Sequence, residues 1–248
     1  MSSSRSGREG LNGTYRLGMF FARTSIGALT RDRWGGAEHL PQRGGFLVCA
    51  NHISQADPFA VARFLYDSGH SPYFLAKESL FRAPVIGPIM TRSGQIPVHR
   101  GTSHASHAFQ SAIDAVAGGK CVVLMPEGTL TKDPDWWPMT GKTGAARIAL
   151  ATGRPVVPLA QWGTQFIRHR KADKGIRVVS HMLAGPEVQM DDLRGQELDG
   201  PLLREATERI MSAITVELEK VRRLEAPRGR WDLRAGRRIE RVTREDFR

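Results

Sequence analysis

His52 and Asp57 stand five positions apart, directly after the apolar run 46–50. A carboxylate that holds an imidazole makes that imidazole a better general base, so this pair could take a proton from a hydroxyl. On an ideal helix, residues five apart point well away from each other. The two side chains can therefore meet only if the segment between them turns, as it does where a strand leads into a helix.

The neighbouring residues favour such a strand-to-helix turn. Pro58 follows Asp57, and Asp-Pro is a good helix opening, with the aspartate as the cap and the proline at the first helical position. We therefore expect His52 to lie in the turn that leaves the strand 46–50. The residues alone leave a second interpretation open, in which Asp57 is only a helix cap and His52 only a satisfied loop histidine.

Arg100 ends a second strand-like segment, which begins at Gly94. A turn and a helix cap follow in Gly101-Thr102-Ser103, and a cation at a strand end beside a helix N-terminus is suited to holding an anion. The alternative is an exposed arginine at a strand terminus. No carboxylate stands at metal-ligand spacing from the three histidines of this region, so we expect no metal site at His99, His104 and His107.

Glu127 and Gly128 follow the apolar run 121–124, in a Pro-Glu-Gly-Thr sequence that ends at Thr129. Because glycine lacks a Cβ, the backbone there can approach whatever lies over the strand end. Glu127 could orient a substrate hydroxyl or an arginine at that place.

Lys142 stands at the start of an expected helix, within the sequence Gly-Lys-Thr-Gly. This sequence is similar to the end of a phosphate-binding P-loop, but it lacks the first glycine of that motif at the right spacing. The chain is therefore not a P-loop nucleotide hydrolase. Lys142 could still meet a single phosphate.

Four motifs occur along the chain in a characteristic order. They are Asn-His-x-x-x-x-Asp at 51–57, Gly-x-Ile-x-x-x-Arg at 94–100, Pro-Glu-Gly-Thr at 126–129 and Val-Pro-Leu at 157–159. Together they resemble the glycerophospholipid acyltransferase family, and within it the 1-acylglycerol-3-phosphate acyltransferases. The resemblance covers about residues 44–165.

The resemblance implies that His52 takes the proton from an acceptor hydroxyl while Asp57 orients the imidazole. The hydroxyl then attacks the thioester of acyl-CoA or acyl carrier protein directly, with no acyl-enzyme, no metal and no other cofactor. The implied acceptor is 1-acylglycerol-3-phosphate, which gives phosphatidic acid. Arg100 would hold its phosphate, and Lys142 would add a second contact. The implied substrate-binding residues are Asn51, Ser54, Gly94, Arg100, Glu127, Gly128, Thr129 and Lys142.

The third motif departs from the family pattern. The family continues Pro-Glu-Gly-Thr with Arg-Ser, whereas this chain has Leu130 and Thr131. An arginine that helps to bind phosphate is therefore missing. Lys132 lies two residues after Leu130, but a lysine offers no bidentate fork. Glycerol-3-phosphate or another lysolipid stays open as the acceptor for that reason.

From residue 44 onward, short apolar runs alternate with helical patterns. This alternation predicts a single α/β domain, with a mostly parallel or mixed sheet flanked by helices, and the resemblance implies the same fold. Ligand sites in such sheets lie where strands lead into helices, as His52 and Glu127 do. The expected strands are 46–50, 72–76, 95–98, 120–125, 155–160 and 176–183. The expected helices are 58–67, 80–92, 103–117, 142–152 and 201–224.

Outside the expected acyltransferase domain at 44–224, we expect three further segments, two of which precede the domain. Residues 1–10 are polar and predicted to be disordered, and 11–43 form an amphipathic segment with an imperfect helical pattern. This segment could pack on the domain or lie in a membrane interface with its arginines toward headgroups. Trp136 and Trp137 suit the same interface, or could pack over the site. We see no secretory signal and no apolar run long enough to span a membrane, so a peripheral place at the cytoplasmic face of the cell membrane is expected.

The net charge of +11 is concentrated toward the C-terminus, where residues 225–248 form a basic tail. Such an excess of arginine draws a protein toward nucleic acid, anionic lipid or a phosphorylated substrate. A basic nucleic-acid-binding module is therefore the alternative of a different class. The sequence has neither aromatic–basic interleaving nor a recognition helix, so we expect no nucleic acid partner. Cys49 and Cys121 are expected to be buried free thiols.

Overall fold

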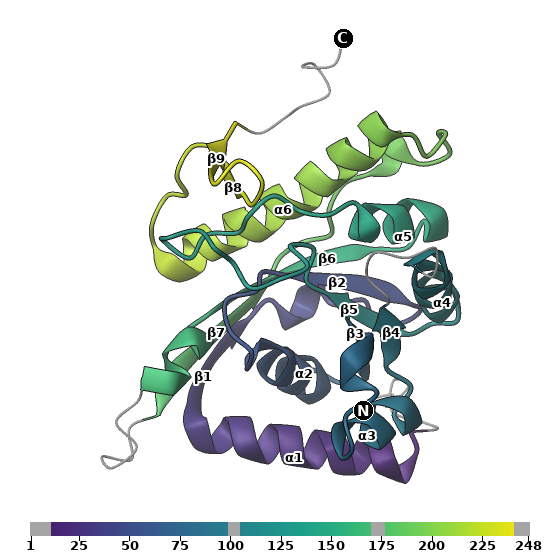
Figure 1. The fold of residues 1–248 in the computed structure, drawn as a ribbon, viewed down its shortest axis with the longest axis vertical. Coiled ribbons are helices and arrows are strands. Elements are labelled where there is room, and N and C mark those ends of the chain that lie inside the picture. The colour runs from purple at the N-terminus through teal and green to yellow at the C-terminus, as the bar shows by residue number, and fades with distance from the viewer. Residues whose placement is uncertain (1–10, 99–104, 170–176, 241–248) are drawn as a thin grey trace.

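The computed structural model describes residues 11–98, 105–169 and 177–240. Within them, seven strands form one sheet in the order β1-β7-β6-β2-β5-β3-β4 (Figure 1). Neighbouring strands are parallel, except that β6 and β7 are antiparallel. The strands are β1 (Thr30–Gly35), β2 (Phe46–Ala50), β3 (Pro72–Lys77), β4 (Ile96–Val98), β5 (Cys121–Leu124), β6 (Val156–Trp162) and β7 (Val178–Ala184).

Helices cover both faces of this sheet, which confirms the expected α/β fold (Figure 1). One layer holds α1 (Gly13–Leu29), α2 (Asp57–Asp67) and α3 (Ile86–Arg92). The other holds α4 (Ala105–Ala117), α5 (Gly144–Thr152) and α6 (Gly200–Arg222). Short 3-10 helices are η1 (Ala37–His39), η2 (Glu78–Leu80), η3 (Thr164–His169) and η5 (Asp191–Leu193).

The central strands are buried on both faces, as parallel strands between two helical layers must be. All five residues of β2 are buried. Leu47 and Cys49 belong to the apolar cluster under α4, α5 and α6, whereas Phe46 and Val48 belong to the cluster under α1 and α2. Continuous apolar runs therefore form these strands, and their carboxyl ends carry the candidate site. Cys49 and Cys121 are buried and free, as expected.

The structure differs from the expected elements at several places. The expected helix 80–92 is two elements, η2 and α3, because Pro84 disfavours helical backbone at the residue before it. Helix α5 begins at Gly144, so Lys142 precedes it. Strand β1 lies within the segment expected to be amphipathic. Its sequence shows no alternation because it is an edge strand with exposed arginines, which removes the usual strand signal.

Helix α1 packs through one face only. Its buried residues are Tyr15, Met19, Ala22 and Ile26, and the Tyr15 hydroxyl donates to the Pro72 carbonyl at 3.0 Å. This spacing is the apolar stripe of an amphipathic helix. Across the described parts of the chain, no helix is both long enough and apolar enough to cross a membrane.

Residues 230–239, inside the expected basic tail, fold as a hairpin of β8 (Arg230–Asp232) and β9 (Arg237–Ile239) beside α6 (Figure 1). Arg230 is 3% exposed, and its guanidinium donates to both carboxylate oxygens of Glu208 and to the Thr215 hydroxyl. The hairpin is thus tied to the fold by a buried cation. The expected disordered residues 1–10 and the end of the tail, 241–248, lie outside the described residues.

Candidate active site

The turn from β2 into α2 brings His52 and Asp57 together. His52 Nδ1 lies 2.9 Å from Asp57 Oδ2. The same oxygen accepts the backbone N–H groups of Ile53 at 2.7 Å and Ser54 at 2.9 Å, so the carboxylate faces back over the turn. Asp57 is the first residue of α2, whose cap position is Ala56, so the expectation that Asp57 caps the helix is wrong. The interpretation of Asp57 as only a cap falls with it.

The tautomer of His52 follows from this contact. The Asp57 carboxylate accepts, so in the neutral form of the imidazole Nδ1 carries the proton and Nε2 holds the lone pair. The Asp57 side chain is fully buried, whereas that of His52 is 19% exposed. An imidazole held in this way can accept a proton at Nε2 from a group at the surface of the site.

A residue that the sequence analysis missed holds the other oxygen of Asp57. The Thr164 hydroxyl donates to Asp57 Oδ1 at 2.6 Å, and Thr164 is buried. Both oxygens of this carboxylate therefore take part in hydrogen bonds. One available signal is that Thr164 lies two residues after the end of β6, at the same edge of the sheet as His52.

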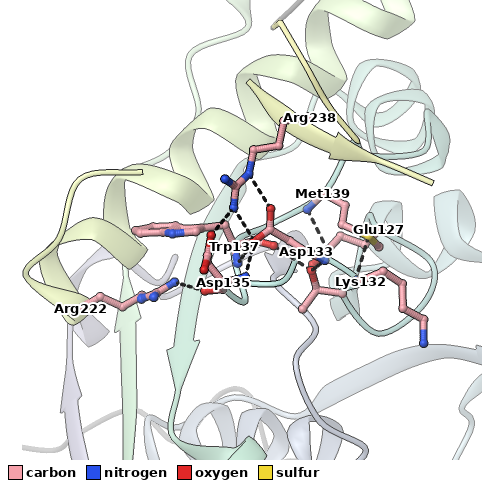
Figure 2. Close-up of polar contacts among 9 residues, drawn as sticks. Glu127, Lys132, Asp133, Asp135, Trp137, Met139, Arg222 and Arg238 are labelled. Carbon is pink, nitrogen blue, oxygen red and sulfur yellow. Dashed lines mark hydrogen bonds and ion pairs between the residues drawn. The ribbon is translucent and has the colours of Figure 1, made fainter. Parts of the chain in front are cut away.

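The backbone of His52 is fixed from both sides. Its N–H donates to Glu127 Oε1 at 2.9 Å, and its carbonyl accepts the Thr131 N–H at 2.7 Å. Glu127 Oε2 in turn accepts the Met139 N–H at 3.0 Å (Figure 2). Both Glu127 oxygens are thus bonded to backbone, and the residue is 1% exposed. Its place in an acceptor pocket stays a prediction.

Burial raises the pKa of Glu127 to about 8. The negative charge of Asp57 acts in the same direction, and the two backbone N–H groups oppose it. This carboxyl group is therefore largely protonated at neutral pH, when its hydroxyl oxygen can still accept a hydrogen bond.

Gly128 and Lys142 meet beside Glu127. Gly128 has φ +70°, a conformation that favours glycine. The exposed Lys142 donates its backbone N–H to the Pro126 carbonyl at 2.8 Å, and its side chain lies against Gly128. The motif and the lysine are therefore neighbours, although Lys142 does not start a helix. Thr129, next along the chain, is half-buried.

Asn51 faces the sheet. Its side-chain amide pairs with the Gln161 backbone through bonds of 2.8 and 3.0 Å, and the Gln161 side chain donates to the Asn51 carbonyl. Asn51 is 1% exposed, so it ties the end of β2 to that of β6. Ser54 accepts the Ala56 N–H within the turn.

Two other expected residues lie farther along. Gly94, with φ +71°, makes the turn before β4, and Arg100 lies outside the described residues, as do His99 and His104. In the part of the chain that the structure describes, no three His, Cys, Asp or Glu side chains are grouped to hold a metal ion.

A family model described as Acyltransferase matches residues 33–162. The chain is 29% identical over 150 residues to a 1-acyl-sn-glycerol-3-phosphate acyltransferase of Borreliella burgdorferi, over 59% of this chain and 58% of that protein. It is 35% identical over 131 residues to the chloroplastic 1-acyl-sn-glycerol-3-phosphate acyltransferase BAT2 of Brassica napus, over 52% of this chain and 36% of that protein. The matched stretches thus span less than two thirds of either relative.

The fold also resembles the crystal structure of the 1-acyl-sn-glycerophosphate acyltransferase PlsC from Thermotoga maritima. The TM-score is 0.62 at 22% identity, over 86% of this chain and 81% of that one, which supports the arrangement of the sheet and its helices. The family model spans more than half of the chain and contains the turn with His52 and Asp57, the Glu127 segment and β6. The chain therefore belongs to the Acyltransferase family.

Proposed function

We propose that this protein transfers a fatty acyl group from a thioester to a hydroxyl of a glycerophosphate acceptor, with 1-acylglycerol-3-phosphate as the acceptor and phosphatidic acid as the product. The observation that carries the proposal is the 2.9 Å contact of His52 Nδ1 with the buried Asp57. It leaves Nε2 as the proton acceptor in a partly exposed position. The names of the curated relatives support the same acceptor.

The proposed reaction is a direct displacement. His52 Nε2 takes the proton of the acceptor hydroxyl as its oxygen attacks the thioester carbonyl carbon. The C–S bond then breaks, and the proton passes from His52 to the leaving thiolate. The thioester is activated enough to need only a base and donors for the developing oxyanion, so neither a metal nor another cofactor takes part. Acyl-CoA and acyl carrier protein both supply such a thioester.

The acceptor's phosphate requires cations near His52. Lys142 is exposed, and its side chain lies against Gly128. Gly128 belongs to the same Pro-Glu-Gly-Thr motif as Glu127, which accepts the His52 N–H. Arg100 is the second cation that we propose, on the basis of the family resemblance. Leu130 stands where the family has arginine, and the nearby Lys132 is exposed. Glycerol-3-phosphate or another lysolipid is the alternative acceptor, and a panel of acceptors distinguishes them.

We also propose that the enzyme works at the membrane surface through an α1–α3 apolar patch. Its members are 39–75% exposed: Leu17, Phe20, Phe21, Val85, Ile86 and Ile89. The two helices are neighbours, since a β-carbon at Gly18 would lie 3.5 Å from Ile89 Cγ2 (Figure 1). Arg16 is exposed on α1 and suits anionic headgroups, whereas Arg23 is paired with Asp67 of α2 at 2.8 Å. Of the two adjacent tryptophans, Trp136 is 40% exposed and Trp137 only 5%. Their loop is bonded to Arg222 at the end of α6, in the other helical layer, so neither belongs to this patch.

The test is acyl transfer from palmitoyl-CoA and oleoyl-CoA to a panel of acceptors by purified protein. We expect His52→Ala to lower kcat by about 10²- to 10⁴-fold, the contribution of a general base. His181→Ala, which removes an imidazole from β7 outside the site, should leave kcat unchanged. An active His52→Ala variant contradicts the mechanism. Tight, salt-dependent nucleic acid binding without transfer to any acceptor would favour the basic-module alternative.

Arg100→Ala tests the proposed phosphate contact separately. We expect it to raise KM for a phosphate-bearing acceptor far more than KM for acyl-CoA. Equal effects on both constants would remove Arg100 from the acceptor site while leaving acyl transfer in place.

A further inference from the structure

The loop 131–139 holds the peptide groups of His52 at both of its ends. At one end, the Thr131 N–H donates to the His52 carbonyl at 2.7 Å. At the other, the Met139 N–H donates to Glu127 Oε2 (Figure 2). The second oxygen of Glu127 accepts the His52 N–H. The position of the imidazole therefore depends on the shape of this loop.

Asp133 determines that shape. Its Oδ1 accepts the backbone N–H groups of Asp135 at 2.9 Å and Trp137 at 3.3 Å. Its own N–H donates to the Thr131 hydroxyl, which donates to the Trp137 carbonyl at 2.8 Å. The carboxylate thus holds together the two halves of the loop from its centre.

Asp133 is a buried charge and needs a partner, because an unpaired carboxylate in the interior is strongly disfavoured. Its side chain is 1% exposed. Arg238, 105 residues farther along on β9, supplies the partner in a two-point contact, with Nε to Oδ2 at 2.8 Å and Nη2 to Oδ1 at 2.9 Å (Figure 2). Arg238 Nη2 also lies 2.7 Å from Asp135 Oδ2.

A second cation holds the same loop from α6. Arg222 donates to the Asp135 carbonyl at 2.8 Å. Its guanidinium lies between the rings of Trp137 and Trp162, 4.1 and 4.2 Å from their centroids. Stacking of this kind favours arginine over lysine.

The hairpin that carries Arg238 is itself anchored at two places. Arg230 joins it to α6 through Glu208. On the other side, the Thr140 N–H donates to the Trp231 carbonyl at 3.0 Å, and the Thr140 hydroxyl lies 3.2 Å from Asp232. The hairpin is therefore a fixed support for the loop.

We propose that Arg238 is a positioning residue for His52, acting through Asp133 and the loop 131–139. The expected effect on catalysis rests on the proposed function. Arg238 lies beyond residue 162, in a part of the chain that the family model does not cover. It assigns at least one arginine of the basic C-terminal segment to the support of the site. The Asp133 carboxylate, which Arg238 neutralises, is the link between the hairpin and the base.

The test compares Arg238→Ala and Arg238→Lys with Arg237→Ala. Arg237 is the exposed neighbour on β9, so its loss removes the same charge from the same strand. Amide hydrogen exchange of the folded proteins is measured over 127–139 and at His52, and kcat is normalised to the folded fraction. Arg238→Lys, which keeps the charge but loses the fork, supplies the result if Arg238→Ala does not fold.

We expect Arg238→Ala to speed exchange at His52 and over 127–139 by about 10-fold or more, with the central strands unchanged. We expect kcat per folded molecule to fall by about 10- to 100-fold with KM for the donor retained, as misplacement of a reacting group does. The exchange rates and kcat of Arg238→Lys should lie between those of wild type and Arg238→Ala, and those of Arg237→Ala should match wild type.

The inference would be overturned if the Arg238 variants kept the exchange rates and kcat of wild type. It would also be overturned if exchange became faster evenly over the whole sheet, because that indicates only lost stability. Transfer activity in wild type and Arg237→Ala shows in the same experiment whether the proposed function holds. If wild type transfers no acyl group, the exchange measurement still decides whether Arg238 orders the loop and His52.

Discussion

The side chain of Lys142 lies across the backbone of Gly128. A β-carbon at Gly128 would stand 3.0 Å from each of the Cδ, Cε and Nζ atoms of Lys142, which is closer than ordinary van der Waals contact. Gly128 also has φ +70°, a backbone conformation that favours glycine. The positions of Glu127 and Lys142 therefore depend on the absence of a side chain at residue 128. The relationship joins the third motif to a cation 14 residues away.

Gly128→Ala should displace Lys142 and raise KM for a phosphate-bearing acceptor more than KM for acyl-CoA. The left-handed backbone should also cost about 1–2 kcal/mol of unfolding free energy, measured by urea denaturation. Gly153→Ala is the matched control, because Gly153 has φ +60° but nothing lies within 4 Å of an added β-carbon. It should lose similar stability with acceptor KM unchanged. Equal KM values for the two variants would contradict a role for this contact.

Thr164→Val should lower kcat by about 10- to 100-fold, because the valine leaves Asp57 Oδ1 without its 2.6 Å donor. A hydrogen bond to a charged group contributes about 1.5–3 kcal/mol, which corresponds to that range if it is lost from the active geometry. Thr164→Ser keeps the hydroxyl and should retain most of the activity. Steady-state kinetics of both variants, with folding checked by near-UV circular dichroism, decides between a hydroxyl effect and a packing effect.

Glu127→Gln should flatten the dependence of stability on pH. The folded pKa of Glu127, about 8, exceeds the ordinary value of 4.5, so the native protein holds a proton that the unfolded chain releases. Its stabilising effect is complete below the unfolded pKa and is lost as pH rises through about 8, with a slope of up to about 1.4 kcal/mol per pH unit.

Urea unfolding of wild type and Glu127→Gln between pH 5 and 8.5 measures this effect. At low pH the variant should be less stable by about 1–3 kcal/mol, because glutamine can no longer accept both the His52 and Met139 N–H groups. The difference should shrink as pH rises. A difference that stays constant with pH would show that Glu127 ionises normally.

Phe20→Asp and Phe21→Asp should weaken sedimentation with liposomes that contain anionic lipid. Both side chains are about 60% exposed on the α1–α3 apolar patch, and a carboxylate there opposes both burial and headgroup attraction. Leu224→Asp, at a residue 58% exposed just beyond the end of α6, is the control and should bind like wild type. Helix α6 lies on the opposite side of the sheet from α1 and α3 (Figure 1). Unchanged binding of the Phe20 and Phe21 variants would remove the patch from the membrane proposal.

Local sequence signals predict the central strands well because each of these strands is a short, continuous apolar run. The five apolar residues of β2 are recognisable from their own composition, and Pro58 identifies the start of α2. The direction of the Asp57 side chain is a different matter. Its type and place suit a cap, but its carboxylate bonds back to Ile53 and Ser54, which depends on the conformation of the whole turn.

Contacts between distant segments leave even less trace in the sequence. The pairing of Arg238 with Asp133 joins residues 105 positions apart, and no periodic pattern encodes it. An excess of arginine predicts a solvated basic tail equally well. Thr164 has no distinguishing motif, although its place after β6 is informative once the sheet order is known.

The two thiols of the central strands lie under different helical layers. Cys49 packs among residues under α4, α5 and α6, whereas Cys121 packs among those under α1 and α2. Burial raises the pKa of both thiols, so neither forms a reactive thiolate while its layer is closed. The alkylation rate of each cysteine therefore reports how often one helical layer separates from the sheet. If Cys121 is alkylated before Cys49, the layer that carries the α1–α3 apolar patch loosens independently of the layer beside the C-terminal hairpin. Equal alkylation rates mean that both layers separate from the sheet together.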